Sequence, residues 1–158
     1  MNKNSIKYLV GKFTLTDKSS ALSVTAKVEK SSNYVDALFF VEVFPFNHSA
    51  GSISIAFDAV ELRSFANQME ELGHGVLPII KKHSGGSGGG KLLTLSLSAE
   101  HPICLIEFLE RNEKILFQLP RHMLYGLSKQ LEHIVNTTMD AVYKTQQHVE
   151  KKKPKAKQ

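Results

Sequence analysis

Two series of alternating apolar and polar residues, each followed by a helical pattern, constrain the fold of this chain most. Period-2 alternation predicts strands over about residues 8–16, 22–29, 34–46 and 53–57. It predicts further strands over residues 76–82, 93–98, 103–109 and 114–119. Apolar residues at helical spacing follow each series, over about residues 58–73 and 120–148. We therefore predict an α+β fold in which four strands and a helix occur twice, with antiparallel sheets packed against both helices.

The two halves also align with each other. A shift of 62 residues places Ile53, Phe57 and Leu62 on Ile115, Leu119 and Leu124. Amphipathic strand-then-helix units also share such a rhythm by chance, so the alignment indicates similar folds and does not require common ancestry. At 158 residues the chain is the size of one domain. We predict a single domain over residues 1–148, with halves at 6–75 and 76–148.

Local signals refine individual elements. Asp58 is a favourable N-cap for the first helix, and Glu61 three residues later completes a capping-box pattern. Pro78 indicates that the fifth strand lies at a sheet edge. The strand over residues 34–46 is apolar on both faces, which is typical of a central strand covered on both sides.

Two segments stand outside the predicted elements. Residues 85–90 read Gly-Gly-Ser-Gly-Gly-Gly, which is typical of a flexible linker, including an engineered one, and provides no side-chain chemistry. Residues 149–158 hold five lysines after position 150 and are expected to form a disordered basic tail. Without those lysines, 15 basic residues balance 15 acidic ones, so the net charge of +5 belongs to the tail.

Composition excludes several kinds of site. The single cysteine, Cys104, rules out a disulfide framework within the chain and lies in an apolar run, which predicts a buried, inert thiol. Its isolation favours a reducing, intracellular compartment. The seven histidines show no metal-binding spacing, so we expect neither a metal nor another cofactor. No apolar run is long enough to span a membrane, and we expect no membrane partner.

Catalytic signals are weak. Glu42 and Glu107 each lie in a strongly apolar strand, where burial would raise the pKa of a carboxyl group enough for acid–base chemistry. The alternative is that each marks the rim of the core or pairs with a lysine. We favour this alternative and expect a binding protein.

One sheet face of the first half has the composition of a nucleic-acid surface. Lysines would neutralise phosphates, hydroxyl groups would position the backbone, and an aromatic ring would stack on a base. Any half-exposed antiparallel sheet is also rich in lysine, serine and threonine, so the signal is not specific. Tyr34 is a second aromatic candidate. The predicted contacts with single-stranded DNA or RNA are Tyr8, Lys12, Lys27, Lys30 and Lys82, together with the tail residues Lys151, Lys152 and Lys153.

The predicted order of strands and helices resembles the Whirly fold of plant single-stranded-DNA-binding proteins, which kinetoplastid guide-RNA-binding proteins share. The resemblance covers about residues 6–148 and is one of topology, because the Lys-Gly-Lys-Ala-type motif of plant Whirly proteins is absent. It implies packed helices, outward sheets and nucleic acid lying across the sheets. A second hypothesis is a protein-interaction or scaffold subunit, including a homo-oligomer. It would use the long C-terminal helix or an exposed sheet edge.

Overall fold

The computed structural model describes residues 5–47, 51–84, 90–98 and 101–152, with side chains except at Ser84 and 148–152. The first half contains β1 (Ile6–Thr16), β2 (Ser20–Lys30), β3 (Val35–Pro45), β4 (Ile53–Phe57) and α1 (Ala59–Gly73). The second half contains β5 (Ile79–Ser84), β6 (Lys91–Leu97), β7 (Ile103–Glu110), β8 (Glu113–Pro120), a short 3₁₀ turn (Arg121–Met123) and α2 (Leu124–Lys152).

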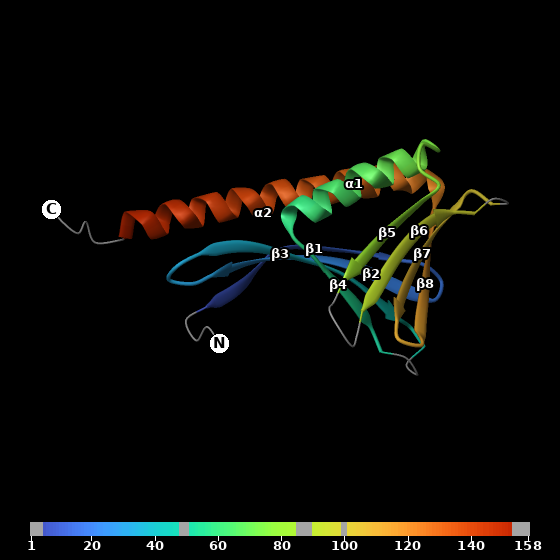
Figure 1. Ribbon diagram of the computed structural model, residues 1–158, viewed down its shortest axis with the longest axis horizontal. Coiled ribbons are helices and arrows are strands. Elements are labelled where there is room, and N and C mark those ends of the chain that lie inside the picture. The colour runs from blue at the N-terminus through green and yellow to red at the C-terminus, as the bar shows by residue number, and fades with distance from the viewer. Residues whose placement is uncertain (1–4, 48–50, 85–89, 99–100, 153–158) are drawn as a thin grey trace.

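The strands form two antiparallel four-stranded sheets, in the orders β1-β2-β3-β4 and β5-β6-β7-β8. The predicted α+β architecture with two similar halves is confirmed. The helices pack on each other as one layer over the sheets, and the second sheet runs at a steep angle to β1–β3 (Figure 1). β5 is an edge strand, as Pro78 predicts.

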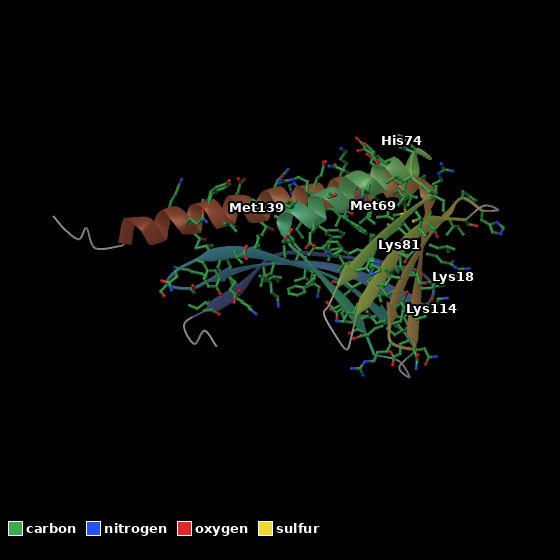
Figure 2. The ribbon with its side chains drawn as sticks, viewed as in Figure 1. Lys18, Met69, His74, Lys81, Lys114 and Met139 are labelled. Atoms are coloured by element: carbon green, nitrogen blue, oxygen red, sulfur yellow. The ribbon has the colours of Figure 1, made fainter. Side chains whose placement is uncertain are left out.

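The core lies where the two sheets and the helix layer meet. Leu22 and Val41 from the first sheet, Leu95 and Ile106 from the second, and Met69 from α1 are all almost fully buried there. Figure 2 shows Met69 of α1 and Met139 of α2 between the helix layer and the sheets. Because one face of each sheet is used in this way, the opposite face of each sheet points away from the helices.

The helices begin and end close to the predicted positions. Asp58 and Glu61 form the predicted capping box: Asp58 Oδ1 accepts from Glu61 N at 2.7 Å, and Glu61 Oε1 accepts from Asp58 N at 2.9 Å. α2 begins after the 3₁₀ turn and continues to Lys152, so four residues expected in the disordered tail are helical. Neither helix is long and apolar enough to cross a membrane, among the residues described.

The second half of α2 does not project freely. It lies over the ends of β1, β2 and β3, with Thr138 and Val142 buried against them. Near the end of the described side chains, Thr145 Oγ1 lies 2.8 Å from the hydroxyl oxygen of Tyr8 in β1. The C-terminal part of the long helix predicted to contact a partner therefore already covers one face of the first sheet.

A β-bulge at Val10 decides which side chains of β1 face which way. Leu9 pairs with Lys27 and Gly11 pairs with Ala26, so Val10 is an extra residue in the ladder. Before the bulge, Tyr8 lies opposite Val28 and faces the helices. After the bulge, Phe13 lies opposite Val24 and faces the helices. The expectation that Tyr8 shares a face with Lys12 is therefore wrong.

The two sheets are also joined by a carboxylate. Asp17, in the turn between β1 and β2, accepts from Ser19 N and Ser20 N through Oδ1, both at 2.8 Å. Its Oδ2 accepts from Gln118 N of β8 at 2.7 Å. Partial burial acts to raise the pKa of Asp17, but the backbone donors Gln118, Ser19 and Ser20 hold it below its ordinary value.

Candidate nucleic-acid interface

The face of the first sheet that points away from the helices carries a compact patch of basic and apolar side chains. The register places Lys12 opposite Thr25 and Thr25 opposite Phe40, and it places Lys27 between Leu9 and Leu38. These pairs form two adjacent rows across three strands. We call the set the β1–β3 patch: Leu9, Lys12, Thr25, Lys27, Leu38 and Phe40.

An aromatic ring and an ammonium group lie together in the patch. Lys27 Nζ lies 5.8 Å from the centroid of the Phe40 ring, within the range of a cation–π contact. Phe40 and Leu38 are half-buried, Lys12 is exposed, and Leu9 is 59% exposed. The patch therefore offers a flat apolar surface with positive charge directly beside it.

Acidic residues border the patch on two sides. The row beyond Leu9, Lys27 and Leu38 contains Glu29 and Asp36 beside Lys7, and the row beyond Lys12, Thr25 and Phe40 contains Glu42. A polyanion would avoid these rows, because like charges repel. The favourable path over this face therefore runs across the strands, along the rows of Lys12 and Lys27.

A buried hydroxyl group next to the patch has spare hydrogen-bonding capacity. Ser23 lies opposite Glu42 and Thr14 on the same outer face and is 3% exposed. Its Oγ has no hydrogen-bond partner within the described part of the chain. Buried polar atoms in native proteins usually have a partner, so Ser23 Oγ is an exception among the described residues.

Two of the predicted contacts, Lys12 and Lys27, come together in the patch. The two others from the first sheet do not. Tyr8 faces α2, and Lys30 lies opposite Ile6 and Val35 on the same helix-facing side. The prediction for Tyr8 assumed strict alternation along β1 and did not include the bulge.

Lys82 is also placed differently from the expectation. It lies opposite Leu93 on the core-facing side of the second sheet. Its ammonium group is bound to Glu61 and lies 5.1 Å from the centroid of the Phe57 ring, and its side chain is only 17% exposed. The hydrogen bond from Lys82, with a smaller contribution from Asp58 N, lowers the pKa of Glu61. Lys82 thus joins α1 to the second sheet.

The tail lysines are only partly described. Lys151 and Lys152 belong to the last turn of α2, and nothing further is described of their side chains. Lys153 lies outside the described residues, as do residues 85–89 of the Gly/Ser run, which joins β5 to β6. The role of the tail stays a prediction.

The groups considered for catalysis have ordinary partners. Glu42 accepts from Ser52 Oγ at 2.8 Å, and Glu107 pairs with Lys114 at 3.3 Å. Burial raises the pKa of the Cys104 thiol to about 12, in agreement with the predicted inert, buried cysteine. Within the described ranges, no group of three or more His, Cys, Asp or Glu side chains could hold a metal ion.

The sequence did not identify the aromatic component of the patch. β3 is an interior strand of its sheet, as predicted, but its outer face is not covered: Phe40 is half-buried and Phe44 is 39% exposed. The prediction of a strand covered on both sides is therefore wrong. A strand with apolar residues on both faces does not by itself distinguish a covered outer face from an open binding face.

Comparison with known proteins identifies the architecture. No protein-family model and no curated protein matches the sequence. Among solved structures, the plant transcriptional regulator PBF-2 superposes with a TM-score of 0.61 at 11% identity, over 95% of this chain and 91% of that one. WHY1 from Arabidopsis thaliana superposes with a TM-score of 0.59 at 13% identity, over 83% of this chain and 91% of that one. Identities this low establish the fold alone, and this chain has a Whirly-like fold.

Proposed function

We propose that this protein binds single-stranded nucleic acid, DNA or RNA, across the outer face of its first sheet. The observation that carries the proposal is the pairing of Phe40 with Lys27, with Lys12 in the adjacent row. A base would stack on the exposed side of the Phe40 ring, and the two ammonium groups would neutralise neighbouring phosphates. Thr25, between Lys12 and Phe40, would donate a hydrogen bond to the sugar or phosphate.

Two further features support this proposal. The fold is shared with a plant transcriptional regulator, PBF-2. The expected intracellular location also suits a nucleic-acid ligand. None of the contacts proposed for the patch reads the edge of a base, so we expect weak dependence on base sequence.

Stacking and charge neutralisation can be separated experimentally. Binding of a fluorescein-labelled single-stranded oligonucleotide would be measured by anisotropy over a series of salt concentrations. Replacing both Lys12 and Lys27 with Ala should reduce the slope of log affinity against log salt by about 1.4, since each phosphate contact with a single strand contributes about 0.7. Replacing Phe40 with Ala should leave the slope unchanged and weaken binding by about fivefold or more, the loss of one stacked base.

A matched control is available on the helix layer. Lys144 is exposed on α2, on the opposite side of the first sheet from the patch. Lys144→Ala changes the charge as each patch lysine variant does, and it should leave the affinity nearly unchanged. Equal losses for Lys144 and for the patch lysines would contradict a defined surface. So would the absence of any affinity for oligonucleotides at low salt.

The contribution of the tail is measured with a variant that ends at residue 150. If the tail lysines bind phosphates, this variant should lose affinity and salt slope together for every oligonucleotide. The Phe40→Ala variant should show the same fold loss with and without the tail, because stacking and tail binding are independent.

A further inference from the structure

The edge strands of the two sheets differ in whether side chains from elsewhere bind their backbone groups. On β4, the edge strand of the first sheet nearest the second, Lys91 Nζ donates to Ser54 O at 2.8 Å. On β8, the edge of the second sheet, Gln118 N donates to Asp17. Side chains from elsewhere in the chain thus occupy backbone groups at both edges, which hinders the addition of another strand.

The edge formed by β1 has no such cover. Within the described residues, no side chain is bonded to a backbone group of β1. After the bulge, Gly11–Thr16 pairs with β2 without interruption, so this stretch has the regular geometry that a further strand requires. Its outward N–H and C=O groups are free to bind another chain.

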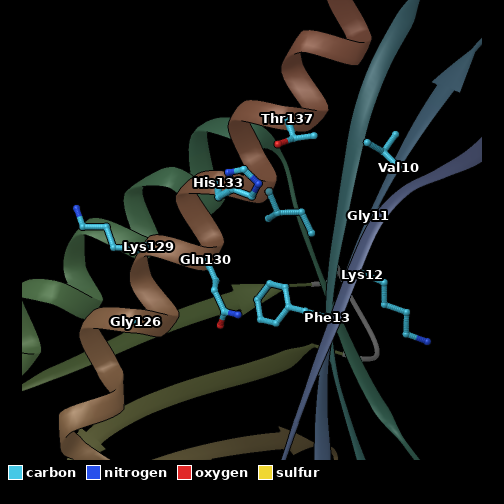
Figure 3. Close-up of a pocket in the computed structure, with 10 residues that line it drawn as sticks. Val10, Gly11, Lys12, Phe13, Gly126, Lys129, Gln130, His133 and Thr137 are labelled. Atoms are coloured by element: carbon cyan, nitrogen blue, oxygen red, sulfur yellow. The ribbon is translucent and has the colours of Figure 1, made fainter.

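A groove of about 500 Å³ runs beside this stretch, between β1 and α2. Phe13 points toward α2 in Figure 3, and His133 and Ile134 of α2 line the groove, with Ile134 next to Gly11. Gly11 contributes no side chain, and a Cβ there would lie only 3.4 Å from Ile134 Cγ1. The missing side chain therefore lets Ile134 of α2 pack directly on β1, on the side to which alternate residues of an added strand would point.

The charges around the groove favour a ligand with negative charge. Lys12, Lys129 and His133 line it, and none of the described lining residues is acidic. Lys129 Nζ pairs with Glu132 Oε2 at 3.4 Å, so Lys12 is the lining cation without an ion pair among the described residues. In Figure 3, Lys12 points away from the helix, toward the outer face of the sheet. An added strand would thus meet apolar surface with one set of its side chains and Lys12 with the other set.

We propose that β1 and the groove bind an extended acidic peptide, which adds as a fifth strand to the first sheet. The peptide pairs with the free edge of Gly11–Thr16. Its apolar residues enter the groove beside Phe13 and Ile134, and its acidic residues lie on the outer face beside Lys12. Backbone hydrogen bonds provide the affinity and the alternating side chains provide the specificity, as in other strand-addition complexes.

Two other occupants fit less well. A second copy of β1 would bring Lys7 and Lys12 against the same residues, and β1 has no acidic residue to offset them. A nucleic acid would neutralise the lysines, but it lacks the regular alternation of N–H and C=O groups that a strand edge pairs with. Because Lys12 belongs to both the groove and the β1–β3 patch, a bound peptide competes with an oligonucleotide for it.

The first test uses a defined probe: a fluorescein-labelled octapeptide of alternating glutamate and valine, with a lysine–valine octapeptide as its control. Hydrogen exchange of the full chain is measured with and without each peptide. The acidic peptide should slow exchange within residues 11–16 and leave β5, another edge strand, unchanged. It should bind at least about fivefold more tightly than the basic peptide, which is the effect expected of one rim charge.

Two variants keep the test independent of any loss of folding. Lys12→Glu and His133→Glu alter exposed side chains at the groove, and Lys144→Glu makes the same charge change as Lys12→Glu elsewhere on α2. The two groove variants should each weaken binding of the acidic peptide by about fivefold or more, and Lys144→Glu should not. Circular dichroism confirms that all three remain folded.

Several results would overturn the proposal. One is the absence of peptide binding at about 1 mM, the weak limit of specific recognition. Another is binding without protection of residues 11–16. Protection of these amides that increases with protein concentration alone would identify a second copy as the occupant. Protection by an oligonucleotide but not by the peptide would assign the edge to nucleic acid.

Discussion

Ser128 Oγ of α2 donates a hydrogen bond of 2.8 Å to Ala66 O of α1, and the two residues are separated by 62 positions. That separation is the same shift that aligns the two halves of the sequence, so equivalent positions of the two helices meet at their crossing. Both residues are fully buried and small. The helices can therefore approach closely at this point, and the two halves are joined through it.

Enlarging Ser128 should be far more harmful than removing its hydroxyl group. Ser128→Ala loses one hydrogen bond and should lower the free energy of unfolding by about 1 kcal/mol. Ser128→Leu must force the helices apart and should lower it by about 3 kcal/mol or more. Urea denaturation followed by circular dichroism measures both. Gln68→Leu, at an exposed position of α1, is the control and should have little effect. Similar losses for the two Ser128 variants would show that the crossing is not tightly packed.

Asp17 should make the contact between the sheets sensitive to acid. Because the folded state lowers the pKa of this carboxyl group, its stabilising contribution is complete above the ordinary Asp pKa. The contribution is lost as the pH falls through the lowered value. Asp17→Ala should cost about 1–2 kcal/mol at pH 7, the loss of a charged acceptor. It should also flatten the pH dependence of stability on the acidic side, as measured by thermal unfolding between about pH 2 and pH 6. Asp36→Ala, at an exposed position of β3, is the control.

Lys82 should contribute to stability and not to oligonucleotide binding. Its ammonium group is bound to Glu61, which also caps α1. Lys82→Ala should lower the thermal midpoint of unfolding by a few degrees, about 1 kcal/mol, through the loss of this partly buried contact. The oligonucleotide affinity of the folded protein should change less than it does for Lys27→Ala. A loss of oligonucleotide affinity as large as that of Lys27→Ala would contradict this prediction and would show that Lys82 contributes to binding.

Cys104 should be unreactive in the folded protein. The residue is completely buried, and a thiol with a pKa of about 12 has almost no thiolate at neutral pH. A thiol reagent should therefore modify it only at the rate of unfolding, and modification should become fast in denaturant. Mass spectrometry of samples taken over time measures this rate. Rapid labelling under native conditions would contradict a buried position.

The architecture could be predicted from the sequence because each helix and strand has its own periodic pattern of apolar residues. The apolar positions of β2 and β8 alternate without interruption, and Asp58 with Glu61 begins α1 as their spacing predicts. Tertiary contacts between distant residues leave no comparable signal in one sequence. The bond between Lys82 and Glu61, and the closeness of Lys27 to Phe40, depend on how separate elements meet in space.

The bulge in β1 did have a signal. Ile6, Tyr8 and Val10 occupy even positions and Phe13 and Leu15 occupy odd positions, with Gly11 between the two sets. Leu9 is the apolar residue that departs from this pattern. A change of phase next to a glycine is typical of a bulge. This change of phase would have placed Tyr8 on the helix side of the sheet.

The single extra residue at Val10 has a consequence for the evolution of such a strand. Deletion of one codon there would restore strict alternation and leave Tyr8 under α2 and Leu9 on the outer face, because Leu9 already pairs with Lys27 and Gly11 with Ala26. Pairing of Val10 with Lys27, without a deletion, would instead turn Tyr8 outward and bring Lys7 and Leu9 under α2 while leaving Gly11–Thr16 in place. The polarity of this sheet edge depends on whether Val10 is bulged or paired as much as on the identity of any side chain.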